Sequence, residues 1–228
     1  MIGRTHMTIS TRGALSSLFQ AALLALTLGA VTGQAQAQSG PNAREHLERI
    51  SAAKPADQKT AHDNGKKASF FCANCHGEFG SSKYPEVPNL AGQHPAYVLN
   101  QIDAFLTGKR KDAFMQGLMK VLNNEEKASI AHYYSTQIPV PAMATPGPRA
   151  AEGRDLYQKH CQRCHGPDAR GAESMPRLAG QQVEYLRRSL SRYLKNTGER
   201  NYPAMTAAMN GLGESHIEAV AEYLAALR

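Results

Sequence analysis

The four cysteines of this 228-residue chain fall into two copies of one short motif. The copies read Cys72-Ala-Asn-Cys75-His76 and Cys161-Gln-Arg-Cys164-His165. The C-x-x-C-H pattern is the attachment signature of c-type haem, in which each thiol forms a thioether with a haem vinyl group and the histidine binds the iron. Two intervening residues let both sulfurs lie on one helical turn. The sequence therefore predicts two covalently bound haem c groups.

The C-x-x-C spacing has other uses, which leave alternatives open. It also occurs in zinc knuckles and in redox-active dithiols. An exported chain with four cysteines could instead form two disulfides. None of these readings explains why a histidine follows each cysteine pair directly. The duplicated motif therefore favours haem over a zinc-stabilised interaction module.

The amino terminus has the three-part layout of a secretory signal peptide. Arg4 and Arg12 precede an apolar run at 14–31, and the small residues Ala35-Gln-Ala37 follow. We expect cleavage after residue 37 and export to the periplasm. A retained membrane anchor is the alternative, because the run is just long enough to span a bilayer.

Charge and length limit what the mature chain can do. Cleavage removes two positive charges from the formal net charge of +7 and leaves +5, and it leaves 191 of the 228 residues, which suits two small domains. Four haem propionates would bring the molecule nearer neutrality. Basic residues are interspersed with acidic ones, and no Lys/Arg block carries aromatic residues. The sequence therefore gives nucleic-acid binding little support.

An internal repeat extends well beyond the haem motif. The string Leu90-Ala-Gly-Gln93 recurs as Leu178-Ala-Gly-Gln181, and an amphipathic segment follows each copy. Apolar residues at 98–106 and 186–194 have the i, i+4, i+7, i+8 spacing of a helix with one buried stripe. The repeat therefore predicts two similar helical modules rather than one large domain.

Each copy contains two methionines after this helix. Met115 and Met205 lie seven residues after a glycine that ends the helix, and Met119 and Met209 lie four residues further on. The earlier pair is closer to the glycine-terminated loop, where a side chain can turn towards the iron. We therefore predict Met115 and Met205 as axial ligands, and the later pair as core residues.

The helical spacing and the repeat predict an all-α protein with two tandem modules. The predicted segments are a signal peptide at 1–37, a polar extension at 38–61, a first module at 62–138, a proline-rich linker at 139–149 and a second module at 150–228. The extension contains a short helix at about 43–53, and Asn123 with Glu126 predicts a capping box before a closing helix. A module of roughly 75 residues buries little core unaided, so a covalent porphyrin would supply its apolar centre.

Two matched arginines and several unmatched histidines carry weaker signals. Arg110 and Arg200 each stand two residues after the glycine that ends the middle helix. They could pair with haem propionates, although solvated surface arginines are the commoner case. His94, His132 and His160 have no partner in the other copy, so surface or packing roles are expected for them.

The chain resembles the dihaem cytochromes c of the cytochrome c4 group, periplasmic electron carriers with two class I cytochrome c domains. The resemblance covers about residues 62–228 and rests on the two haem motifs, the two Leu-Ala-Gly-Gln strings and the two methionine segments. In that family the axial methionine precedes a leucine by seven residues, which matches Met115 with Leu122 and Met205 with Leu212.

The resemblance also implies the surroundings of each iron. A family proline, here Pro88 or Pro176, would offer its carbonyl to the ligating histidine and fix the imidazole tautomer. The chain departs from the family in its longer polar extension and in Gly213, which stands where a polar helix cap is expected. Neither departure involves a predicted haem ligand.

The function implied by the resemblance is electron transfer without catalysis. Cys72, Cys75, Cys161 and Cys164 would hold the two haems, and the axial pairs would be His76 with Met115 and His165 with Met205. Both axial positions are then filled, which argues against an enzyme. By resemblance the donor would be a quinol-oxidising complex and the acceptor a terminal oxidase, and peripheral association with the membrane is compatible with this role. The alternatives are the cytochrome subunit of a periplasmic dehydrogenase and a small haem peroxidase.

Overall fold

The computed structural model describes residues 42–143 and 145–228. The predicted signal peptide at 1–37 lies outside these residues. In the described part, the regular elements are helices, joined by loops that contain two isolated β-bridges. The expected all-α fold is thereby confirmed. None of the helices in the described part is long and apolar enough to cross a membrane.

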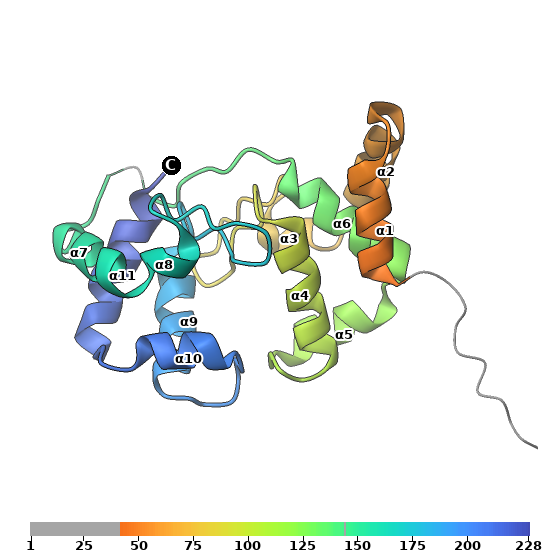
Figure 1. Cartoon of the computed structure of the whole chain (residues 1–228). Helices are drawn as coiled ribbons and strands as arrows, with labels where there is room; N and C mark the ends of the chain where they lie inside the picture. The colour runs from red at the N-terminus through yellow and green to blue at the C-terminus, as the bar shows by residue number, and fades with distance from the viewer. Residues whose placement is uncertain (1–41, 144) are drawn as a thin grey trace, which may run out of the picture. The chain divides into compact units, whose positions relative to one another are not determined.

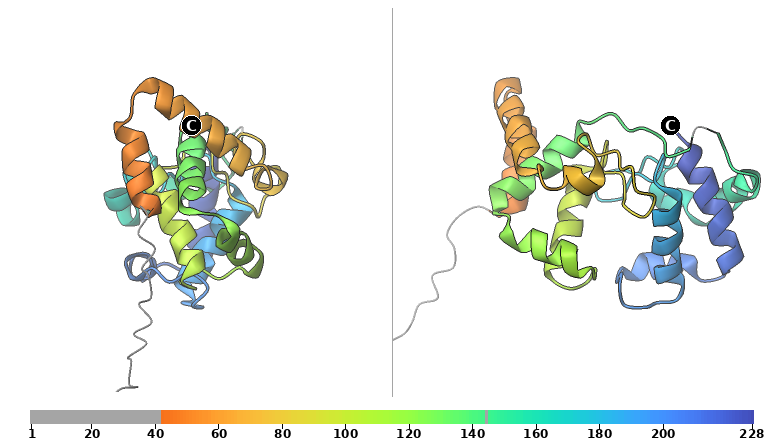
Figure 2. Two further views of the ribbon diagram at one scale, coloured as in Figure 1. Left: turned by 90° about the vertical axis from the view of Figure 1, so that its right-hand side faces the viewer. Right: turned by 180° about the vertical axis from the view of Figure 1, so that it is seen from behind.

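The helices form two groups that follow one another along the chain (Figures 1 and 2). The first group contains α1 (Ala43–Ala52), α2 (Pro55–Ala68), α3 (Ala73–His76), α4 (Pro95–Leu106), α5 (Ala113–Val121) and α6 (Asn124–Ser135). The second contains α7 (Ala150–His160), α8 (Gln162–His165), α9 (Val183–Leu194), α10 (Pro203–Met209) and α11 (Glu214–Ala226). The main helix–helix contacts lie within one group or the other.

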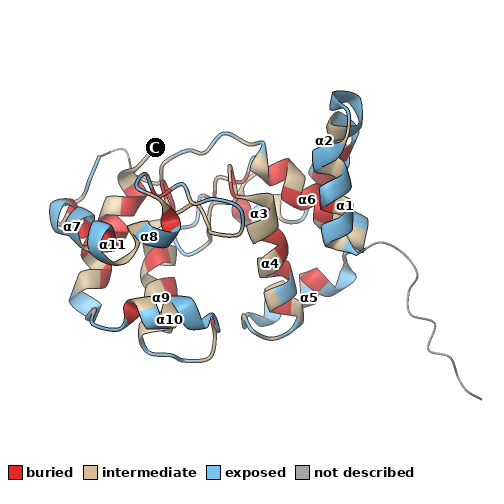
Figure 3. Cartoon of the chain, viewed as in Figure 1, coloured by how far each residue is buried: buried red, intermediate tan, exposed pale blue. Residues whose placement is uncertain are grey.

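The closing helix of each group is the centre of its core. Helices α1, α2 and α4 pack on α6, and α7 and α9 pack on α11. Figure 3 shows buried residues concentrated along α6 and α11. The predicted capping box of α6 is present, because the Asn123 side chain accepts from the Glu126 N–H and the Glu126 carboxylate accepts from the Asn123 N–H. This exchange satisfies two donors that the helix start would otherwise leave unpaired.

The polar extension is more than a solvated tail. Helix α1 begins at Ala43, as the sequence predicts, and Asn42 caps it. Leu47 is buried in the same apolar cluster as Val98 and Ile102 of α4, and Ile50 packs against that cluster. Two apolar residues one turn apart thus attach an otherwise polar helix to the first module.

Two glycines allow the helix before each haem motif to approach the closing helix. A Cβ on Gly65 of α2 would collide with the carbonyl of Ser129, and a Cβ on Gly153 of α7 would collide with the carbonyl of Ala219. Ala219 follows Ser129 by 90 residues, so the two contacts are copies of one another. Only a residue without a side chain fits at this crossing.

The Leu-Ala-Gly-Gln repeat is a turn that joins two parts of each module. In the first copy, the Leu90 and Ala91 N–H groups donate to the Gly80 carbonyl at 2.6 and 2.9 Å, and the Gly92 N–H donates to Tyr134 at the end of α6. In the second copy, the corresponding acceptors are Ala169 and Leu224. The turn therefore fastens the loop after each haem motif to the closing helix.

The glutamine of each repeat binds the other module. The Gln181 Oε1 accepts from the Asn89 N–H at 2.7 Å, and its Nε2 donates to the Asn89 carbonyl at 3.0 Å. Gln93 makes the same pair of contacts with Arg177, at 2.8 and 3.0 Å. Both glutamines are buried. Two reciprocal clamps therefore hold the haem-motif loops of the two modules together.

Replacing Gln181 with alanine should open one clamp and leave the other closed. The Asn89 N–H and carbonyl would lose their partners, which costs about 1–3 kcal/mol for a buried polar group. We expect faster hydrogen exchange at the Asn89 amide and unchanged exchange at Arg177, whose partner Gln93 is intact. Gln93→Ala should give the reverse pattern. Equal protection of both amides in both variants would contradict this assignment.

Candidate haem sites

The first haem motif folds into one turn, helix α3, directly after Cys72. The Cys72 carbonyl accepts from the Cys75 N–H at 3.2 Å and from the His76 N–H at 2.8 Å. The His76 ring is buried, and its Nδ1 lies 2.9 Å from the Pro88 carbonyl oxygen. Since Nδ1 donates this bond, the other nitrogen, Nε2, carries the lone pair that a metal can bind.

The second motif repeats this arrangement in helix α8. The His165 Nδ1 lies 3.2 Å from the Pro176 carbonyl oxygen. The His165 Nε2 is buried and has no hydrogen-bond partner in the protein. A buried polar atom without a partner requires an explanation, and an iron ligand supplies one. The expected proline–histidine contacts are therefore confirmed in both modules.

Burial sets the protonation of these groups. Burial lowers the pKa of His76 and of His165. The hydrogen bonds to the proline carbonyls raise the pKa, but the effect of burial is larger. Both rings are therefore held in the neutral form that binds metals. Burial raises the pKa of Cys72, and it raises that of Cys161 to about 11. Redox dithiols have lowered thiol pKa values instead, and the four cysteines form no disulfide.

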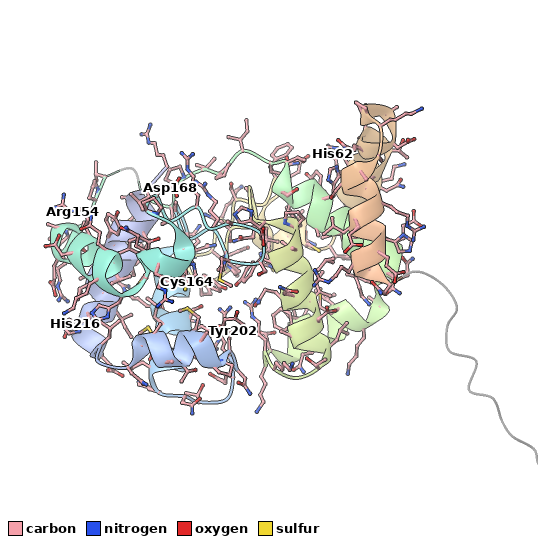
Figure 4. The ribbon with its side chains drawn as sticks, viewed as in Figure 1. His62, Arg154, Cys164, Asp168, Tyr202 and His216 are labelled. Carbon is pink, nitrogen blue, oxygen red and sulfur yellow. The ribbon has the colours of Figure 1, made fainter. Side chains whose placement is uncertain are left out.

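Met115 and Met205 occupy equivalent places in the two modules. Each is the third residue of its helix, α5 or α10, and each is half-buried. Met119 and Met209 are instead buried, at 5% and 3% exposure. In Figure 4, Cys164 lies on α8 and Tyr202, the N-cap residue of α10, lies at the start of the helix that carries Met205.

The methionine segments differ from the sequence prediction in one respect. The sequence predicts loops there, but both methionines lie in the first turn of a helix. The Asp112 side chain accepts from the Met115 N–H at 3.0 Å and so caps α5. Pro203 is the first residue of α10, where its missing N–H costs no hydrogen bond. Both helix-start signals are visible in the sequence.

The residues of each module fit a covalently bound haem. Two thiols on one turn would bind its vinyl groups, and the histidine Nε2 would bind its iron. Met115 and Met205 are the candidates for the second protein ligand of each iron. A haem held in this way supplies an iron that changes reversibly by one electron. The protein's own part is to orient the imidazole, shield the iron from water and close the module round it.

Comparison with known proteins identifies the family. The cytochrome c family model matches residues 62–137 and 150–228. The cytochrome c4 of Thiocapsa roseopersicina is 33% identical over 174 residues, which cover 71% of this chain and 89% of that protein. The chain belongs to the cytochrome c family, as a dihaem cytochrome of the c4 type.

Two further relatives of this c4-type cytochrome extend the comparison. The crystal structure of reduced recombinant cytochrome c4 from Pseudomonas stutzeri matches with a TM-score of 0.67 at 27% identity, and covers 73% of this chain and 98% of that one. A thiosulfate dehydrogenase electron acceptor from Stutzerimonas stutzeri (strain A1501) is 32% identical over 190 residues, which are 76% of this chain and 87% of that protein.

Family membership confirms the predicted cofactors and the general role. The two modules of the c4-type cytochrome carry two covalent haem c groups, at Cys72/Cys75 and at Cys161/Cys164. The protein is an electron-transfer cytochrome whose partners are redox proteins.

The arginines are where the sequence prediction was wrong. Solvated side chains were the commoner expectation, but Arg200 is only 5% exposed and Arg110 is half-buried. They come together because the loops that carry them form an antiparallel β-bridge between the modules. His94 also bridges the modules, with its Nε2 2.8 Å from the Arg170 carbonyl oxygen. The matched spacing of the arginines was the available signal, but spacing alone does not indicate burial.

Proposed function

We propose that this cytochrome is exported to the periplasm, where it carries single electrons between respiratory complexes. Each iron is bound by one histidine and one methionine, His76 with Met115 and His165 with Met205. The observation that supports this most is the matched placement of the two methionines, each half-buried in the first turn of the helix before the closing helix. A neutral thioether favours ferrous iron and fills the sixth position.

The proposed domain boundaries follow the repeat. The signal peptide is 1–37, the extension 38–61, the first haem module 62–138, the linker 139–149 and the second haem module 150–228. The linker stays close to the second module, because the Ala142 N–H donates to the Gly180 carbonyl and the Met143 N–H to the Ala225 carbonyl, both at 3.1 Å. In the full carrier the donor would be a membrane quinol-oxidising complex and the acceptor a terminal oxidase.

Redox titration and peroxide assays test this function. A small reductant should reduce the protein rapidly and deliver two electrons per chain, because each haem takes one. The haems should exchange electrons faster within a chain than between chains, since the modules are clamped together. Peroxide should be consumed no faster than by other six-coordinate c-type haems. Sustained peroxide turnover that is lost on mutating a residue other than a haem ligand would favour the peroxidase alternative.

A second candidate function is to accept electrons from a periplasmic dehydrogenase. The similarity to a thiosulfate dehydrogenase electron acceptor supports it. The two functions differ in the donor. Membranes containing a quinol-oxidising complex should reduce the cytochrome when quinol is added if the first proposal holds. Faster reduction by thiosulfate with thiosulfate dehydrogenase than by those membranes would favour the second.

A further inference from the structure

A buried hydroxyl beside the first haem motif has no hydrogen-bond partner. Tyr134 of α6 is fully buried, and its hydroxyl forms no hydrogen bond among the residues that the structure describes. Its ring belongs to a small apolar cluster with Ile130 and Tyr133, and Cys72 packs against that cluster. Buried polar atoms without a partner are rare in folded proteins. The Tyr134 hydroxyl therefore indicates a partner that the polypeptide alone does not supply.

The second module fills the equivalent space in a different way. Tyr134 corresponds to Leu224 of α11, 90 residues later. In that module the buried ring comes from the other helix, because Tyr157 of α7 lies in one apolar cluster with Leu224, and Cys161 packs against them. The counterpart of Tyr157 in α2 is the small residue Ser69, since each stands four residues after the glycine of the helix crossing. The tyrosine has thus changed helix between the two copies.

The other tyrosines of these clusters fasten a helix to a loop. The Tyr157 hydroxyl donates to the Gly166 carbonyl, directly after the second haem motif. Tyr133, the neighbour of Tyr134, donates to the Glu78 carbonyl at 2.8 Å. The Tyr134 hydroxyl fastens nothing. A phenylalanine at this position would fill the same space without an unpaired group, so packing does not explain the hydroxyl.

Gly80 shows that the loop of the first module accommodates the Tyr134 ring. A Cβ at Gly80 would lie 2.8 Å from the Cδ1 atom of that ring. The equivalent loop residue of the second module, which accepts the same turn hydrogen bonds, is Ala169. An alanine fits there because the smaller Leu224 stands opposite. Serine at 69, glycine at 80 and tyrosine at 134 therefore occur together in the first module, and none of them occurs in the second.

The Tyr134 hydroxyl remains a hydrogen-bond donor in this environment. Burial raises the pKa of Tyr134, and the negative charge of a Cys72 thiolate would raise it further. The Ser69 hydroxyl has the opposite, smaller effect on this pKa, but it donates to the Lys66 carbonyl at 3.0 Å and forms no hydrogen bond with Tyr134. The phenol is therefore protonated, beside a cysteine whose sulfur becomes a thioether when haem is attached.

We propose that the Tyr134 hydroxyl donates a hydrogen bond to the Cys72 thioether sulfur and so favours the ferrous state of the first haem. A thioether sulfur is a weak acceptor, which suits a buried donor that finds no oxygen. The positive end of the O–H dipole would face the porphyrin edge, where a low dielectric strengthens its effect on an added electron. The inference rests on the covalent haem at Cys72. It goes beyond the proposed function, because it requires neither a methionine ligand nor a particular redox partner.

Tyr134→Phe tests this proposal by removing a single oxygen atom. Redox titration, with the two midpoint potentials assigned to their haems by NMR, should show a lower potential for the first haem and an unchanged one for the second. Loss of one hydrogen bond should lower the ratio of ferrous to ferric haem at a fixed potential by about three- to tenfold. A tenfold change is about 59 mV for a one-electron couple. One C–S stretching band in the resonance Raman spectrum should also shift.

Tyr133→Phe and Ser69→Ala are the matched controls. Tyr133→Phe removes a hydroxyl from the next position of α6, but that hydroxyl binds the Glu78 carbonyl. It should lower the melting temperature and leave both potentials unchanged. Ser69→Ala removes the hydroxyl that influences the pKa of Tyr134, and it should also leave both potentials unchanged. If it lowers the potential of the first haem as much as Tyr134→Phe does, the phenol acts through the serine and the proposal is wrong.

Stability separates a bonded hydroxyl from an unpaired one. If the hydroxyl binds the sulfur, Tyr134→Phe should lower the melting temperature of the holoprotein, whereas removing an unpaired buried hydroxyl is neutral or stabilising. An equal or higher melting temperature with unchanged potentials would overturn the proposal, and so would a C–S band that does not shift. The methionine–iron charge-transfer band should be the same in Tyr134→Phe and in the wild type. Its absence from both would contradict the proposed His/Met ligation and leave this test intact.

Discussion

Replacing Met115, the proposed sixth ligand of the first haem iron, with leucine should remove that ligand and leave the second haem unchanged. The iron should become high-spin or bind exogenous ligands, and the methionine–iron charge-transfer band should fall by about half, because one of two such bonds is lost. The reduction potential of the first haem should fall, since the thioether that favours ferrous iron is gone. Met205→Leu should have the same effects on the second haem.

The later methionines provide the matched controls for this experiment. Met119 and Met209 are buried, and Met119 lies in the core cluster that contains Leu99 and Phe105. Met119→Leu and Met209→Leu nearly conserve side-chain volume. Each should therefore lower the free energy of unfolding by less than about 1.5 kcal/mol and leave the methionine–iron charge-transfer band at full intensity. If these variants abolish the charge-transfer band while Met115→Leu and Met205→Leu preserve it, the axial assignment is reversed.

Adding one methyl group at Gly65 or Gly153 should cause a large loss of stability. The new Cβ would meet the backbone of Ser129 or Ala219, together with the Cβ of Tyr133 or Tyr223. Helix backbone at a packed crossing cannot yield as a flexible side chain can. We expect Gly65→Ala and Gly153→Ala each to cost about 3 kcal/mol, the upper part of the range for overpacked cores.

Thermal unfolding of the holoprotein measures this cost, and Gly213 provides the control. Gly213 is the N-cap residue of α11, and a Cβ there would lie no nearer than 3.9 Å to any atom beyond its two neighbours in the chain. Gly213→Ser should change stability by only a few tenths of a kcal/mol, because serine is at least as good a cap as glycine. Equal melting temperatures for Gly153→Ala and Gly213→Ser would show that the α7–α11 crossing is looser than described.

The haem attachment residues could be predicted because their chemistry is contiguous in the sequence. Cys72, Cys75 and His76 lie on one turn, so their spacing alone places the two thiols and the imidazole together. The repeat then extends the prediction to residues that are distant in sequence. It selects two matched pairs of methionines, Met115/Met205 and Met119/Met209, and it is the closeness of the earlier pair to the glycine-terminated loop that favours that pair as ligands.

The contacts between modules could not be predicted in the same way. The Leu-Ala-Gly-Gln string is recognisable as a repeat, but Gln93 and Gln181 bind residues 84 and 92 positions away. No local pattern encodes such a pairing. Likewise, Arg110 and Arg200 are buried by the meeting of two loops, although each looks like a surface residue in its own segment. Sequence repeats therefore predict modules well, but not the surface by which they associate.

Mass spectrometry of the mature protein tests the central claim most directly. After export and maturation, the chain should weigh the 38–228 polypeptide plus two haems, because thioether bonds survive denaturation. It should also keep its colour in acid–acetone, which extracts haem that is not covalently bound. A colourless chain of polypeptide mass alone, which binds zinc through the same four cysteines, would contradict the account.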